Sequence, residues 1–169
     1  DKYGDFLVVQ IHTLGMDRWR DVIAEALMLH VSPKGIYERS DVGARQGEGL
    51  ETLPVGLLAG EEPPERVDFL ENGMKFVCDV RTGQKTGFFL DQRDNRVNVA
   101  AFCQEAEVLN CFSYSGGFSV FAAQGGATRV ESVDASEPAL LLAKENLSVN
   151  GFDSKDHPCI QENVFDYLK

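Results

Sequence analysis

The arrangement of apolar and polar residues divides the chain into two parts. In the first part, the β-branched and aromatic run at residues 5–11 predicts a strand. A helical pattern follows, with apolar residues every three or four positions up to Pro33, and Asp17 is its expected cap. Residues 36–39 predict a second strand. Residues 41–64 are rich in Gly, Glu and Pro, which predicts an irregular connection.

The second part begins with a hairpin and continues as alternating strands and helices. Residues 67–70 and 75–80 flank Asn72-Gly73, a pair that favours the positive φ angles of a tight turn. Further elements are expected as strands at 108–112, 130–133 and 157–161. Helices are expected at 119–124 and 137–149, and Ser136 is the expected cap of the second of them. This alternation predicts right-handed βαβ units and a parallel sheet.

The fold class predicted from these patterns is α/β, with two domains. A small α+β domain is expected at residues 1–72, and the first half of a Rossmann-like domain at residues 73–169. With 43% hydrophobic and 25% charged residues, the 169-residue chain can bury a core.

Charge and cysteine usage narrow the function classes. Lys and Arg number 16 against 27 Asp and Glu, and the net charge of −11 argues against a free-standing nucleic-acid binder. No apolar run approaches the roughly 20 residues of a membrane span, so no membrane partner is expected. The four cysteines are scattered, with neither zinc-type nor disulfide-framework spacing, which indicates a cytoplasmic location and no metal site.

The segment with the clearest chemical pattern is residues 110–119, Asn-Cys-Phe-Ser-Tyr-Ser-Gly-Gly-Phe-Ser. A strand that ends in small residues before a helix exposes backbone N–H groups to an anionic ligand. The segment therefore predicts a nucleotide or nucleoside pocket, although a plain tight turn is the alternative. Its adjacent Gly116-Gly117 pair does not match GxGxxG, which weakens a dinucleotide interpretation.

Two polar positions follow the next strands. Asp134 lies 18 residues after Gly116, close to the spacing of an acid that binds ribose hydroxyls, although helix capping alone could explain Asp134 or Ser136. Asn163 could meet an adenine edge. Upstream, residues 85–96 combine Arg, Lys and aromatic side chains, which could hold a carboxylate and stack a ring. The alternative is a strand at residues 86–90 followed by a helix that Asp91 caps, with salt-bridged exposed charges.

Three segments, residues 85–96, 109–119 and 133–136, together resemble the large-subunit ribosomal RNA cytosine-5 methyltransferases of the bacterial three-domain type. Close relatives of that group methylate a ribosomal guanine, and these segments do not decide the base. The resemblance implies a cofactor, S-adenosylmethionine (SAM), and three domains: an RNA-binding PUA domain, a central domain and a Rossmann-like catalytic domain.

The resemblance also implies a set of cofactor-binding residues. The loop residues would face the methionine portion, Asp134 with Ser136 beside it would meet the ribose, and Asn163, where the family more often has Asp, would lie near adenine. Phe89, Asp91 and Arg96 would line the methionine end of the cofactor. The complete expected set is Phe89, Asp91, Arg96, Ser113, Tyr114, Ser115, Gly116, Gly117, Asp134, Ser136 and Asn163.

Catalytic residues are expected outside this chain. Cytosine C5 becomes nucleophilic only after a thiolate adds at C6, and the family places that Cys and a Pro-Pro motif beyond the segment that ends at Lys169. The chain also begins without Met, so we expect an internal fragment with weak or no activity of its own. Its own cysteines, Cys78, Cys103, Cys111 and Cys159, are expected to be structural.

The expected partner is ribosomal RNA, bound through the full-length protein. The open edge of half a parallel sheet could also pair with a second copy to form a homodimer. Two other functions stay open at this point: a nicotinamide-dependent oxidoreductase on the same sheet, and a non-enzymatic module whose acidic surface docks a basic partner.

Overall fold

The chain folds into two compact units in the computed structural model, which describes residues 1–53 and 55–169. Unit 1 comprises Asp1–Asp68 and Cys78–Phe88, and unit 2 comprises Phe69–Val77 and Phe89–Lys169. The expected boundary between residues 72 and 73 therefore falls inside a segment that unit 2 takes from the middle of the chain, and residues 78–88 return to unit 1.

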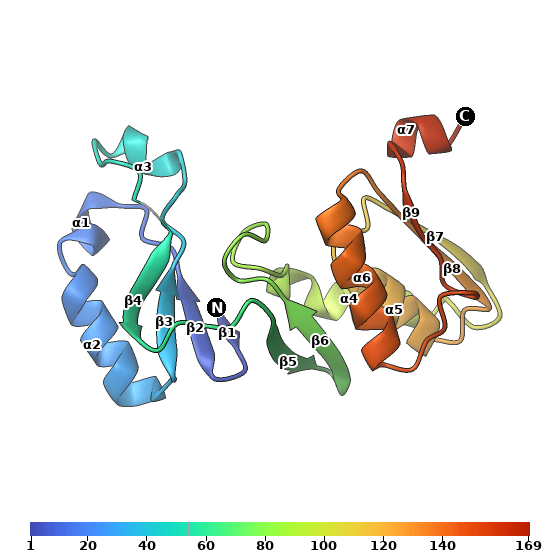
Figure 1. Ribbon diagram of the computed structural model, residues 1–169, viewed down its shortest axis with the longest axis horizontal. Coiled ribbons are helices and arrows are strands. Elements are labelled where there is room, and N and C mark those ends of the chain that lie inside the picture. The colour runs from blue at the N-terminus through green and yellow to red at the C-terminus, as the bar shows by residue number, and fades with distance from the viewer. Residues whose placement is uncertain (54) are drawn as a thin grey trace. The chain divides into compact units, whose positions relative to one another are not determined.

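Unit 1 is a four-stranded mixed sheet with one long helix. Its elements are β1 (Lys2–Tyr3), β2 (Phe6–Val9), α1 (Leu14–Asp17), α2 (Arg20–Val31), β3 (Gly35–Glu38), α3 (Ala44–Gly47) and β4 (Gly56–Gly60). The strand order is β1-β2-β3-β4, with β2 and β3 parallel and the outer pairs antiparallel. Helix α2 connects the parallel pair and runs along one face of the sheet (Figure 1).

The core of unit 1 lies between α2 and the sheet. Buried Leu7, Ala24 and Ile36 form its centre, because β2 and β3 place alternate apolar side chains toward the helix. The irregular connection expected at residues 41–64 is a wrong prediction. The segment at residues 41–64 contains α3 and the fourth strand, β4, because Leu58 and Ala59 pack against the core.

The expected cap of the long helix is also wrong. Thr13 caps the separate short helix α1, and its side chain accepts a hydrogen bond from the Met16 N–H. Asp17 instead ends α1, and one of its carboxylate oxygens lies 2.8 Å from Arg45 Nη2.

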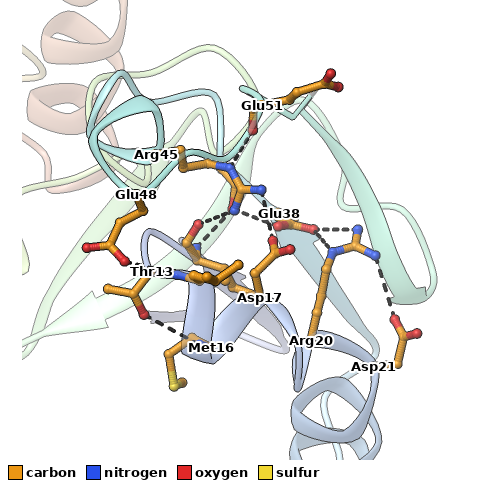
Figure 2. Close-up of polar contacts among 12 residues, drawn as sticks. Thr13, Met16, Asp17, Arg20, Asp21, Glu38, Arg45, Glu48 and Glu51 are labelled. Carbon is orange, nitrogen blue, oxygen red and sulfur yellow. Dashed lines mark hydrogen bonds and ion pairs between the residues drawn. The ribbon is translucent and has the colours of Figure 1, made fainter.

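Two arginine side chains, buried Arg45 and partly exposed Arg20, fix the loops at one end of the sheet (Figure 2). Arg45, 2% exposed, donates from Nε to the Glu51 carbonyl (2.7 Å), from Nη1 to the Ile11 carbonyl (2.6 Å) and from Nη2 to Asp17. Arg20 at the start of α2 pairs with the buried carboxylate of Glu38 on β3. Together these contacts hold α1, the start of α2 and α3 as one rigid group.

The β5 (Val67–Glu71) and β6 (Met74–Cys78) hairpin carries the chain into unit 2. Asn72 and Gly73 adopt φ angles of 49° and 83°, the paired positive values of a type I′ turn, so the predicted hairpin is confirmed. Phe76 stacks on Phe69 and on Phe121, which packs this hairpin against helix α5.

The rest of unit 2 is a parallel sheet with helices. Its remaining elements are the 3₁₀ helix η1 (Leu90–Gln92), α4 (Arg93–Ala100), β7 (Glu107–Cys111), α5 (Gly117–Gln124), β8 (Arg129–Asp134), α6 (Glu137–Val149), β9 (Cys159–Gln161) and α7 (Val164–Tyr167). The strand order is β7-β8-β9, all parallel, and α5 and α6 lie on the same face of this sheet (Figure 1). The predicted α/β fold with a Rossmann-like sheet is thereby confirmed.

The predicted Ser136 cap of α6 is confirmed, whereas the structure before α4 differs from the strand and the cap considered for it. Ser136 caps α6 as expected, accepting from the Ala139 N–H. The strand at residues 86–90, one of the two alternatives for this segment, is absent from this described stretch, which forms turns and the start of η1. Asp91 does not cap a helix: it lies inside η1, and Gln92 is the N-cap residue of α4.

Among the described residues, none of the helices combines the length and the apolarity needed to cross a bilayer.

Replacing Arg45 with Met should destabilise unit 1. The substitution leaves two main-chain carbonyls and the Asp17 carboxylate without their donor, and removing one partner of a buried charged cluster typically costs about 3–5 kcal/mol. Urea unfolding followed by Trp19 fluorescence measures this change in the free energy of unfolding. The matched control is Arg18→Met, because Arg18 is exposed in the same segment; equal stability of the two variants would contradict the role given to Arg45.

Candidate functional site

The loop between β7 and α5 has an unusual backbone. Phe112, Tyr114 and Gly116 have φ angles of 56°, 48° and 75°, so every second residue is left-handed. For a non-glycine residue this conformation costs about 1–2 kcal/mol and is common at functional sites. Surrounding contacts must therefore hold the loop in this shape.

Asp134 at the end of β8 supplies the first of these contacts. Its Oδ2 accepts a hydrogen bond from the Tyr114 N–H (2.8 Å), and its Oδ1 accepts one from the Ser136 N–H (2.9 Å). The Ser113 N–H donates to the Val133 carbonyl, 3.0 Å away. The loop after one strand is thus fastened to the end of the next strand by a half-buried carboxylate.

Asn146 on α6 supplies the second contact, and sequence reasoning missed it. Its fully buried amide donates from Nδ2 to the Ser115 carbonyl (2.9 Å), while its Oδ1 accepts from the Val77 N–H of β6 (2.7 Å). One side chain therefore joins the hairpin to the loop. The available signal was a polar residue within the apolar stripe formed by Ala143 and Leu147.

Two serine hydroxyls in the loop have no internal partner. Ser113 and Ser115 are 6% and 1% exposed, and within the described part of the chain neither Oγ makes a hydrogen bond. Buried hydroxyls are normally satisfied, and an exception calls for an explanation. Because both oxygens are shielded from solvent, a side-chain rotation toward a polar ligand at the loop would be needed to supply the missing partners.

Gly116 allows the loop to approach helix α6. A Cβ added to Gly116 would lie 2.9 Å from the Ala143 Cβ and 3.1 Å from its Cα. Only a residue without a side chain fits this approach and also favours the left-handed conformation. The helix α5 begins immediately after, at Gly117, with no side-chain cap at its N-terminus.

An aromatic pair and a buried arginine lie beside the loop. The rings of Phe89 and Tyr114 meet edge to face with centroids 5.5 Å apart. Arg96 donates to the Phe89 carbonyl (3.0 Å) and forms a bidentate pair with Glu71 of the hairpin, at 2.7 and 2.8 Å. The Arg96 guanidinium therefore positions Phe89. Glu71, the ion-pair partner of Arg96, was not predicted from the sequence.

The other expected site residues lie at the same end of unit 2 or close to η1. Asp91 is exposed. Asn163 follows β9 at the carboxyl edge of the sheet, where the Asn163 Oδ1 accepts from the Phe165 N–H and caps α7. The structure thus brings together Phe89, the loop residues 113–117, Asp134 and Ser136. Asn163 instead has a helix-capping contact.

The cysteines have the character of structural thiols at two positions. Cys78 and Cys103 are buried, whereas Cys111 and Cys159 are partly exposed. Burial raises the pKa of the Cys78 thiol to about 12, and burial also raises the pKa of the Cys103 and Cys159 thiols. A raised pKa lowers the thiolate fraction at neutral pH and with it the nucleophilicity.

These features define a class of protein. A loop with unpartnered hydroxyls and a carboxylate at the end of the next parallel strand form a site of the type that binds a nucleoside cofactor on Rossmann-like domains. Each Asp134 oxygen receives one backbone N–H and retains acceptor capacity for a ribose hydroxyl. The residues present therefore fit a nucleoside cofactor with a small anionic group.

Comparison with known proteins gives the family. The chain belongs to the S-adenosylmethionine-dependent methyltransferases, whose family model matches residues 54–167. The expected class of enzyme and its cofactor class are confirmed by this match.

Relatives and solved structures agree with the family. Proteins named Ribosomal RNA large subunit methyltransferase I from Aeromonas salmonicida and Vibrio cholerae are 46% and 51% identical over the whole chain, which covers 42% and 43% of their lengths. A methyltransferase solved with SAH, the demethylated product of SAM, superimposes with a TM-score of 0.84 at 33% identity, over 98% of this chain and 42% of that one. The chain therefore spans less than half the length of these proteins.

Replacing Gly116 with Ala should distort the loop. The new Cβ meets Ala143 and the φ of 75° becomes strained, so we expect a loss of about 1–3 kcal/mol in the stability of unit 2. Thermal unfolding and amide hydrogen exchange of the loop measure it.

Two controls separate the causes of that loss. Gly151→Ala tests positive φ alone, since Gly151 has a φ of 82° and nothing within 4 Å of an added Cβ. Ala143→Gly added to Gly116→Ala removes the shorter contact, the one to the Ala143 Cβ, and should recover part of the stability relative to Ala143→Gly alone. A Gly116→Ala variant no less stable than Gly151→Ala would show that the close approach is unimportant.

Proposed function

We propose that this chain binds SAM at the loop between β7 and α5, and that the protein to which it belongs methylates large-subunit ribosomal RNA at C5 of a cytosine. The observation that carries the cofactor part is the Asp134 carboxylate, which both shapes the loop and retains acceptor capacity. The RNA part is supported by whole-chain identity to proteins named for that activity. SAM supplies an electrophilic methyl group when bound.

In this proposal the ribose diol donates two hydrogen bonds to Asp134. The backbone N–H groups of Tyr114 and Ser136 hold the two carboxylate oxygens apart at fixed positions, so the acceptor needs little reorganisation when the cofactor binds. Ser136 acts through its backbone, since its hydroxyl caps α6. The Asn163 Nδ2 would lie toward adenine while its oxygen caps α7.

The loop and the start of α5 would hold the methionine portion. The first-turn N–H groups of a helix have no intrahelical acceptor and favour an anion, and Gly116 provides no side-chain cap that would compete. The hydroxyls of Ser113 and Ser115 are the second set of donors. Phe89, positioned by Arg96, would shield this end from water, with Asp91 nearby.

The nucleophile for cytosine C5 would come from the part of the protein outside this chain. A thiolate must add to C6 before C5 can attack a methyl group. The two fully buried thiols, Cys78 and Cys103, do not suit that role, because an attacking thiolate must be accessible and their pKa values are raised. This chain would therefore act as the cofactor-binding half and have little activity alone.

The other two functions are not favoured. A nicotinamide-dependent oxidoreductase would place a GxGxxG loop against a pyrophosphate. This loop instead has adjacent Gly116 and Gly117, which follow the unpartnered Ser113 and Ser115 in sequence. A non-enzymatic module would not explain why the loop keeps a strained backbone, which is common at ligand-binding and catalytic sites.

Further parts of the proposal concern the context of the protein. We propose that residues 1–72 act as a central domain and residues 73–169 as half of the catalytic domain, in a cytoplasmic protein whose RNA partner is bound mainly by other segments. We also propose that an open edge of this half sheet pairs with a second copy of the chain.

Asp134→Ala should weaken SAH binding at least tenfold in calorimetry with this chain. The substitution removes the ribose acceptor and releases the Tyr114 N–H, which loosens the loop. The matched control is Glu107→Ala, an exposed carboxylate at the opposite end of the same sheet. Equal affinity of the Asp134→Ala and Glu107→Ala variants would refute the site.

Ser115→Ala separates ligand contact from loop stability. The Ser115 hydroxyl has no internal partner, so its removal should leave the melting temperature unchanged or slightly raised. A loss of SAH affinity without a loss of stability would support a direct contact. If both quantities stay at their original values, this hydroxyl is not a cofactor donor.

Nucleoside analysis of ribosomal RNA tests the reaction. The full-length protein, incubated with SAM and large-subunit RNA that lacks the modification, should produce 5-methylcytidine, detected by mass spectrometry. The Asp134→Ala variant should lower the initial rate at limiting SAM. Appearance of a methylguanosine instead would refute cytosine as the acceptor and retain RNA methylation, and unmodified RNA would refute both.

A further inference from the structure

The chain has a single tryptophan, Trp19, and it lies on the surface of unit 1. Its side chain is 62% exposed at the junction of α1 and α2. Burying an indole is among the larger hydrophobic gains available to a protein. A large aromatic side chain left in water at a helix junction is a candidate contact with another molecule.

The backbone that carries Trp19 is firmly held. The Trp19 N–H donates to the Met16 carbonyl and the Ile23 N–H donates to the Trp19 carbonyl. On either side, Asp17 is paired with buried Arg45 and Arg20 with buried Glu38, as Figure 2 shows. The indole is therefore presented from a rigid base, so binding to it would require little loss of backbone entropy.

Arg18 adds an available positive charge. It is exposed, and across residues 1–53 and 55–169 its guanidinium makes no ion pair or hydrogen bond, whereas the flanking Arg20 and Arg45 are neutralised by carboxylates. Arg18 immediately precedes Trp19 in the chain, so one short exposed segment carries both a cation for a phosphate contact and a stacking surface. These are the two components of single-stranded nucleic-acid binding.

We infer that Trp19 and Arg18 form a stacking site for one unpaired base of a single-stranded RNA. Trp19 would stack on the base and Arg18 would contact an adjacent phosphate. The inference deepens the proposed function, on which it rests, by naming a substrate contact outside the cofactor site. Exposed Leu14, Met16 and Val22 would suit an apolar protein partner, but such a partner would leave the unpaired Arg18 without a role.

The test uses this chain and a 12-nucleotide oligoadenylate at low salt. Trp19 is its own reporter, and stacking should quench its fluorescence saturably, whereas a duplex of the same length should quench little. In anisotropy with a labelled oligonucleotide, Trp19→Ala should weaken binding at least about fivefold, as expected for loss of one stacked base, and Trp19→Phe should restore part of it. Arg18→Ala should lower the salt slope by about 0.7.

Phe102→Ala is the matched control, since Phe102 is 84% exposed and lies in unit 2. Absence of quenching, or equal weakening by Trp19→Ala and Phe102→Ala, would overturn the inference. A blue shift that grows with protein concentration without RNA would also overturn it, because a second copy would then cover Trp19. SAH binding and 5-methylcytidine formation are independent readouts, so failure here is distinguishable from failure of the proposed function.

Discussion

The cofactor loop depends on one buried carboxamide, that of Asn146. It accepts a hydrogen bond from β6 and donates one to the Ser115 carbonyl, so the hairpin, helix α6 and the loop share a single fixed geometry. Within a low-dielectric interior an unsatisfied amide would be costly, which makes the bridge a strong constraint on all three elements. The left-handed residues of the loop, Phe112 and Tyr114, can persist because this bridge and Asp134 hold the loop from two sides.

Buried arginines play the corresponding part elsewhere in both units. Arg96 ties Glu71 of the hairpin to the Phe89 carbonyl, and Arg45 ties three loops of unit 1. Guanidinium groups suit this work because five donors in a rigid plane can satisfy several acceptors at once. Each arginine also acts close to an exposed or partly exposed aromatic residue, because Arg96 donates to the Phe89 carbonyl and Arg45 pairs with Asp17, two residues before Trp19.

Local signals predicted much of this structure. Asn72-Gly73, the Ser136 cap and the strand-loop-helix pattern around Gly116 each encode their geometry within a few residues, and each was read correctly. The failures came where distant residues decide the outcome. Strand β4 forms because Leu58 packs on a core 20 or more residues away in sequence, and Arg96 turns to Glu71, a partner 25 residues earlier, which the residue pattern around it does not reveal.

The acidic composition now has a more specific meaning. A net charge of −11 disfavours tight RNA binding, yet a surface can be acidic overall and still present a local cation where carboxylates are already paired. In unit 1 Asp17 and Glu38 are paired with Arg45 and Arg20, whereas Arg18, the residue before Trp19, makes no ion pair with the described residues. Such a site would contribute the placement of one base, whereas affinity for a polyanion requires many phosphate contacts. Recognition and affinity can therefore be carried by different parts of a longer protein.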